Sequence, residues 1–166
     1  MLEKAQLLAF ERHKGQFRWD KKTPYYEGHL VPVMKKVGEV VDKTLALYDD
    51  SEEVRKFKEL VQTCAILHDI LEDTTTTENE LLEKFGQEVL DIVKLLTHKN
   101  EDDYIDYIVN LSDDDVANII KQADLEHNSE TTTGNKLKLY RMAKKYLECK
   151  MNFNSILSVA QLMGVA

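Results

Sequence analysis

The chain has 166 residues, 43% of them hydrophobic, which predicts one domain, residues 1–166, with a substantial core. Thirty Asp and Glu against 22 Lys and Arg give a formal charge of −8, so a general nucleic-acid-binding surface is not expected. No signal peptide, lipidation motif or apolar run of membrane-spanning length is visible, and the two cysteines lack metal-ligand spacing. These features are typical of a soluble cytoplasmic protein with reduced thiols.

Apolar residues recur three and four positions apart along almost the whole chain, and no alternating strand pattern competes with them. With only two prolines and six glycines, the predicted fold class is all-α. The expected helices cover residues 2–13, 29–45, 51–73, 77–85, 88–97, 112–128, 136–148 and 153–163, with a further piece around 104–108. We expect Ser51, Thr77 and Ser112 to cap the starts of three of them.

Residues 67–74 carry four polar side chains within an apolar stretch. Positions four apart lie over one another on a helix, so His68 is expected above Glu72, and Asp69 above Asp73. Because the surrounding residues are apolar, this helix is predicted to be central and buried. A buried carboxylate needs a compensating cation, metal ion or set of hydrogen-bond donors, and the neighbouring histidine favours a metal ion. The alternative, a helix end turned to solvent, would explain Glu72 and Asp73 better than His68 and Asp69.

Two other segments supply candidate residues. On the helix predicted over 112–128, His127 continues the buried apolar stripe, and Asp124 and Asn128 form an i,i+4 pair on its flank. Residues 13–24 make the only strongly basic stretch, which includes Lys14 and Arg18. This stretch is interpreted either as a source of substrate contacts or as a solvated loop.

The order of these motifs resembles a known family. His29, the pair His68–Asp69 and Asp124 match the H…HD…D pattern of HD-domain metal-dependent phosphohydrolases. Within that group the closer similarity is to the hydrolase domain of RelA/SpoT homologues, which cleaves guanosine tetra- and pentaphosphate, (p)ppGpp. The matching segments, besides His29, are residues 13–18, 23–25, 67–74, 85–86 and 120–128.

The resemblance implies an all-α HD-domain bundle with a metal site. In it His29, His68, Asp69 and Asp124 would ligate one divalent ion, most often Mn²⁺ in this family. Imidazole and carboxylate ligands in this ratio suit Mn, Fe, Co or Zn on chemical grounds. Such an ion lowers the pKa of a bound water and polarises a phosphoryl oxygen.

The resemblance also implies roles around the metal site. Glu72 and Asp73 would orient or deprotonate the attacking water, or protonate the departing ribose oxygen. The bond broken in this family joins the 3′-oxygen of the nucleotide to its diphosphate, and pyrophosphate is released. The residues implied in substrate binding are Arg18, Lys14, Lys121 and Asn128.

The chain departs from the family pattern on the substrate side. Family members usually have a proline directly after the first metal histidine, where this chain has Leu30. They also have one residue fewer between the Pro-Tyr pair and that histidine, so Gly28 is expected to accommodate the additional residue. They also carry basic residues near the last aspartate, where this chain has Leu125 and Glu130. The loss of positive charge weakens the case for a long polyphosphate and leaves the metal chemistry intact.

Two alternatives to an alarmone hydrolase follow. One is an HD phosphatase of broader specificity, acting on nucleoside monophosphates or a nicotinamide dinucleotide phosphate. The other is a non-catalytic binding domain that keeps the fold. Against the second stands the cost of keeping the metal ligands and the acidic pair Glu72–Asp73 around a core without chemistry.

Overall fold

Helices account for almost all secondary structure in the residues that the structure, a computed structural model, describes: 1–46, 51–98 and 103–151. No β-strand occurs in these ranges, only an isolated bridge between Phe17 and Pro24. The all-α prediction is therefore confirmed. In chain order the elements are α1 (Leu2–Arg12), the π-helix η1 (Tyr26–Leu30), α2 (Val31–Thr44), α3 (Glu52–Ile66), α4 (Ile70–Asp73), α5 (Glu78–Phe85), α6 (Gln87–Leu96), α7 (Tyr104–Leu111), α8 (Asp115–Ser129) and α9 (Gly134–Lys150).

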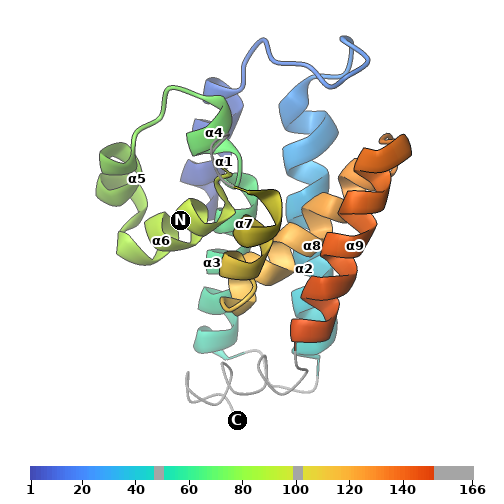
Figure 1. Ribbon diagram of the computed structural model, residues 1–166. Coiled ribbons are helices and arrows are strands. Elements are labelled where there is room, and N and C mark those ends of the chain that lie inside the picture. Colours follow the sequence, from blue (N-terminus) through green and yellow to red (C-terminus); the bar gives the residue numbers. More distant parts are fainter. Residues whose placement is uncertain (47–50, 99–102, 152–166) are drawn as a thin grey trace.

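The helices pack around a single hydrophobic cluster (Figure 1). Helix α2 lies along α3, and α8 packs against α2, α6 and α9. The inner stripe of α2 includes Val33, Val37 and Val41, which are all buried. This arrangement brings the start of α2, the end of α3 and the middle of α8 together, and each of these places carries polar residues.

Two of the three predicted helix caps are confirmed. The hydroxyls of Ser51 and Thr77 each accept a hydrogen bond from the third backbone N–H of their helix, at 3.3 and 3.2 Å. The prediction that Ser112 caps α8 was wrong. Asp114 is the cap, its Oδ1 accepting at 2.8 Å, whereas the Ser112 hydroxyl donates to the Val109 carbonyl and closes α7. Asp114, two residues further on, caps the helix in preference to Ser112 because its negative charge is also stabilised by the positive end of the helix dipole.

The predicted helix over 51–73 was wrong as one continuous element. Helix α3 ends at Ile66, and a turn separates it from α4. In a continuous helix the Ala65 carbonyl would accept from the backbone of Asp69, but here it accepts from the Nδ1 of His68 at 2.8 Å. The break leaves His68 buried in the turn, and the Asp73 N–H still reaches the Asp69 carbonyl at 2.9 Å. The two acids thus keep their one-turn relation.

The helical run that carries His29 begins earlier than predicted and contains a π-turn. Helical backbone starts at Tyr25, and the N–H of Val31 donates to the carbonyl of Tyr26, five residues back. Pro32 follows directly. A proline ring collides with the carbonyl four residues before it in an α-helix, so a widened turn relieves the contact with Gly28. Gly28, the position at which the resemblance places an additional residue, lies within this π-turn.

Other predicted boundaries differ by a few residues. Helix α9 starts at Gly134, two residues before the predicted position, and ends at Lys150. The predicted piece around 104–108 is part of α7. The expected helix over 153–163 lies outside the described residues.

The substitution Gly28→Ala is expected to destabilise the fold by about 1–3 kcal/mol, because its Cβ would stand 2.4 Å from Thr23 Cγ2. Thr23 cannot rotate freely, since its hydroxyl donates to Asp20 at 2.7 Å. Adding Thr23→Ser, which removes the methyl group and keeps the hydroxyl, should restore most of the loss. Urea unfolding of the single and double variants measures both effects, and a single variant as stable as the native protein would contradict the expectation.

Candidate metal centre and active-site pocket

Four predicted ligands meet where η1, the turn after α3 and the middle of α8 come together. The Nε2 of His29 lies 3.4 Å from Asp69 Oδ2 and 3.2 Å from Asp124 Oδ1. The Nε2 of His68 lies 3.0 Å and 3.7 Å from the same two oxygens. His29, His68 and Asp124 are buried and offer ligand atoms that all lie within 4.8 Å of one another. The structure therefore gathers two imidazole nitrogens and two carboxylate oxygens around one point.

This donor set fits a divalent metal ion. Ligand atoms bound at about 2.1 Å to one ion stand roughly 3 to 3.5 Å apart, close to the separations seen here. The Nε2 of His68 is buried and makes no well-aligned hydrogen bond in the described part of the chain. A buried nitrogen that makes no well-aligned hydrogen bond is costly in a folded protein, and a cation at this point would satisfy it.

Each histidine is fixed by its second nitrogen. His68 Nδ1 donates to the Ala65 carbonyl at 2.8 Å, which leaves its Nε2 directed at the carboxylates. His29 Nδ1 lies 3.0 Å from Nδ1 of His127. Partners of this kind set the tautomer and the ring orientation of metal-ligating histidines.

Each of the two carboxylates also has hydrogen-bond or ion-pair partners that are not themselves predicted ligands. The hydroxyl of Tyr25 donates to Asp69 Oδ2 at 2.6 Å. Asn128 donates to Asp124 Oδ1 at 2.6 Å, and Lys121 pairs with Asp124 Oδ2 at 2.9 Å. Asp124 therefore turns one oxygen toward the histidines and the other toward a lysine.

The electrostatics keep both carboxylates charged. Burial disfavours the charged form of Asp124, but Lys121 and the two histidines outweigh it and hold its pKa well below the usual range. For Asp69 burial is likewise outweighed, by His68 first, so its pKa is also lowered. Burial lowers the pKa of His68, but Asp69 and Asp124 raise it to about 10. Without a metal ion, a proton on His68 and the ammonium of Lys121 balance the two carboxylates.

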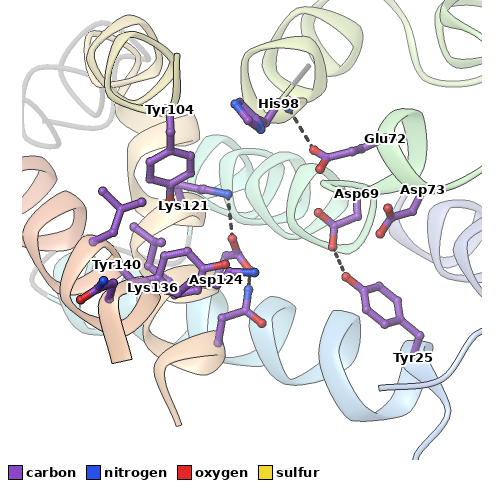
Figure 2. Close-up of a pocket in the computed structure, with 14 residues that line it drawn as sticks. Tyr25, Asp69, Glu72, Asp73, His98, Tyr104, Lys121, Asp124, Lys136 and Tyr140 are labelled. Atoms are coloured by element: carbon purple, nitrogen blue, oxygen red, sulfur yellow. Dashed lines mark hydrogen bonds and ion pairs between the residues drawn. The ribbon is translucent and has the colours of Figure 1, made fainter. Parts of the chain in front are cut away.

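The centre opens into a pocket of about 560 Å³ between α4, α7, α8 and α9 (Figure 2). Asp69 and Asp124 lie in its lining, with Glu72 and Asp73 on one side. The opposite wall comes from α7 and α9, where Figure 2 shows Tyr104, Lys136 and Tyr140. Asn135 and Leu139 of α9 also line the pocket. The pocket thus combines an acidic wall with a wall of aromatic, amide and basic side chains.

Glu72 and Asp73 line the pocket, with much of their surface exposed but with protein atoms around each carboxyl group. Burial raises the pKa of each carboxyl, and the charge of Asp69 adds to the effect on both. Glu72 Oε2 accepts from the backbone N–H of His98 at 2.9 Å, which fixes its direction. Two carboxyls with raised pKa values beside a metal site are suited to proton transfer near neutral pH.

Of the four residues predicted to contact the substrate, two line the pocket and two do not. Lys121 and Asn128 line the pocket. Arg18 stands behind Asn128, donating to its Oδ1 at 3.1 Å, and does not line the pocket. Lys14 is exposed and lies away from the pocket lining.

Several site residues were not predicted from the sequence. Tyr25 was noted only within a matching segment, and His127 was assigned to a buried stripe, although it is half-buried and bonded to His29. His98 lines the pocket and orients Glu72 through its backbone N–H. Tyr25 lies four residues before His29, a spacing that signals proximity on a helix once the helical run is known to start there.

The class of the protein follows from this geometry together with the family match. Residues 26–160 match the HD domain family, and the chain belongs to it.

Two curated bacterial relatives are similar to the chain. One is a GTP pyrophosphokinase of Myxococcus xanthus, 28% identical over 145 residues, which cover 79% of this chain and 17% of the relative. The other is a guanosine-3′,5′-bis(diphosphate) 3′-pyrophosphohydrolase of Haemophilus influenzae, 31% identical over 154 residues, which cover 86% of this chain and 20% of the relative. The chain thus spans about a fifth of the length of each.

A solved structure shares the fold over its whole length. It is described as a metazoan orthologue of SpoT that hydrolyses ppGpp and plays a role in starvation responses. The TM-score is 0.65 at 20% identity, and the match covers 99% of this chain and 96% of that chain. Within the described ranges, no helix has the length and apolar character needed to cross a bilayer.

The substitution His68→Ala is expected to abolish stoichiometric Mn²⁺ binding, because it removes a nitrogen that lies 3.0 Å from Asp69 Oδ2. His98→Ala is the matched control, since His98 lines the same pocket and holds Glu72 through its backbone rather than its ring. Titration of each purified variant with Mn²⁺, followed by electron paramagnetic resonance, gives the stoichiometry. Full retention of the ion by the His68 variant would remove the proposed centre.

Metal binding is expected to release about one proton at pH 7 and to tighten with rising pH. The pKa of His68, about 10 in the metal-free protein, means that a proton occupies the ligand at neutral pH and must leave when the ion binds. Affinity should therefore rise about tenfold per pH unit between pH 7 and 9. Calorimetry in buffers of different ionisation enthalpy counts the proton, and a pH-independent dissociation constant would contradict the expectation.

Proposed function

We propose that the chain is a metal-dependent hydrolase that removes the 3′-diphosphate from guanosine 3′,5′-bis(diphosphate) or a closely similar nucleotide. The observation that carries the proposal is the convergence of two buried imidazoles on Asp69 and Asp124, two carboxylates that line one pocket together with the acidic pair Glu72–Asp73. The similarity to a 3′-pyrophosphohydrolase and the full-length match to the SpoT orthologue support the choice of substrate. A nucleotide of this kind also agrees with the cytoplasmic location expected from the sequence.

The residues that would hold the ion are His29, His68, Asp69 and Asp124, and Mn²⁺ is the ion we propose. When bound, a divalent ion lowers the pKa of a coordinated water and polarises a phosphoryl oxygen. The protein contributes a fixed donor set, because each ligand has a second hydrogen-bond partner in the structure.

Proton transfer falls to Glu72 and Asp73. Hydrolysis requires a base that takes a proton from the attacking water and an acid that protonates the 3′-oxygen as its bond to phosphorus breaks. Both carboxyls have raised pKa values, so either can hold a proton closer to neutral pH than an ordinary acid. Pyrophosphate and the 5′-diphosphate nucleotide leave as products.

Substrate contacts are proposed for Lys121 and Asn128, which line the pocket beside Asp124. Arg18 would act on the substrate side by holding Asn128, or by moving from it to the nucleobase. Lys14, exposed outside the pocket lining, would meet the substrate only as a solvated charge.

One observation favours a second substrate class, a nucleotide with fewer phosphates. Leu125 is buried and lines the pocket at a position where basic residues are usual in the similar family. Lys121 is already paired with Asp124 at 2.9 Å, which leaves Lys136 as the lining cation without a described carboxylate contact. A pocket with little net positive charge suits a substrate of lower charge.

The deciding experiment is incubation of the purified chain with Mn²⁺ and guanosine tetraphosphate, with His68→Ala beside it. Release of pyrophosphate by the native chain alone is the expected result. Bound Mn²⁺ without pyrophosphate release would refute the alarmone substrate, and a panel of nucleoside monophosphates and dinucleotide phosphates would then test the second class.

Glu72→Gln and Asp73→Asn are each expected to lower turnover by about 10²–10⁴ while Mn²⁺ affinity stays within a few-fold of native. The amides keep the shape of the side chains but neither accept nor donate the required proton. Glu78→Gln, an exposed change on α5, is the matched control and should leave turnover unchanged. Turnover is measured from steady-state rates at saturating metal. Native turnover in both variants would indicate that Glu72 and Asp73 are only part of a solvated helix end.

A further inference from the structure

His127 contacts one of the proposed metal ligands, His29, through the ring nitrogen of His29 that does not face the carboxylates. It lies on α8, three residues after Asp124, and its Nδ1 is 3.0 Å from Nδ1 of His29. The ring centroids are 5.0 Å apart with the planes inclined at 53°, so the rings do not stack face to face. The contact is therefore a hydrogen bond between two imidazole nitrogens.

Counting protons shows what this bond requires. Two facing nitrogens share one proton, so one ring donates and the other accepts. The other nitrogen of His29, Nε2, lies 3.2 Å from Asp124 Oδ1 and 3.4 Å from Asp69 Oδ2. For Nε2 to bind a metal ion it must carry no proton, and a neutral ring then has its proton on Nδ1. Among the described residues, His127 is the hydrogen-bond partner recorded for that nitrogen.

The two ligand histidines thus differ in what fixes them. His68 donates to the Ala65 carbonyl, which can only accept, so its tautomer is set by the backbone. His29 faces a side chain that can either donate or accept. The ring orientation and the protonated nitrogen of His29 therefore depend on the side chain of His127, which a substitution can remove.

We propose that His127 is a positioning residue of the metal centre, which accepts the Nδ1–H of His29 and so presents an unprotonated Nε2 to the ion. The proposal rests on the proposed metal site and is independent of the identity of the substrate. Second partners of ligating histidines typically contribute 10- to 100-fold to metal affinity.

The test measures Mn²⁺ dissociation constants for the native chain and three variants. His127→Leu removes the acceptor and should weaken binding 10- to 100-fold. His127→Asn places an amide oxygen near the position of Nδ1 and should bind within about fivefold of native. Glu126→Gln is the control, because Glu126 bonds Lys144 from α8 without touching a ligand, and it should bind as the native chain does.

Two results would overturn the proposal: native affinity in His127→Leu, or equal weakening in the leucine and asparagine variants, which would indicate shape rather than hydrogen bonding. If the leucine variant does not fold, ¹⁵N-resolved NMR of the native chain with diamagnetic Zn²⁺ decides the matter. A proton on His29 Nδ1 supports the proposal and its absence overturns it.

Failure of the native chain to bind Mn²⁺ would refute the metal site together with this role, whereas bound Mn²⁺ without pyrophosphate release would refute only the substrate.

Discussion

The buried carboxylate of Asp124 is the constraint on which the rest of the structure depends. Its side chain is 4% exposed in the middle of α8, where an uncompensated negative charge would cost several kcal/mol. Compensation comes from Lys121 and Asn128 on the same helix and from His29 and His68 on two other segments. Rotating or sliding helix α8 against its neighbours would separate Asp124 from His29 and His68, while its contacts with Lys121 and Asn128 on the same helix would remain. The position of α8 against the segments that carry His29 and His68 is therefore coupled to the geometry of the candidate metal centre.

The pocket separates its two kinds of polar groups. Glu72 and Asp73 stand on one side, close to Asp69, and Lys136 and Tyr140 stand on the other (Figure 2). A phosphorylated ligand lying between them would meet carboxyl groups with raised pKa values at one end and cationic or aromatic groups at the other. Such a division orients a ligand without requiring a large positive potential over the whole pocket.

Much of this could be predicted from sequence because it is local. Helical periodicity indicated the buried faces, and the i,i+4 rule predicted that Asp124 and Asn128 touch, as their 2.6 Å bond confirms. The break after Ile66 could not be predicted from periodicity. No glycine or proline marks it, Ile70 beyond it remains buried, and its cause is a side chain, His68, that takes a backbone carbonyl. Contacts such as Tyr25 with Asp69 join residues 44 positions apart, so they depend on the tertiary packing of helices.

The π-turn before α2 has an evolutionary consequence. It lodges one additional residue between Tyr25 and the helix body, while Val33, Val37 and Val41 remain in the core. An insertion at this point therefore changes neither the buried face of α2 nor the delivery of His29 to the centre. A relative with one residue fewer before this histidine would correspond to this chain through a one-residue gap within the π-turn. Alignments that forbid a gap there would pair the ligand with the wrong neighbour and hide the site in chains built this way.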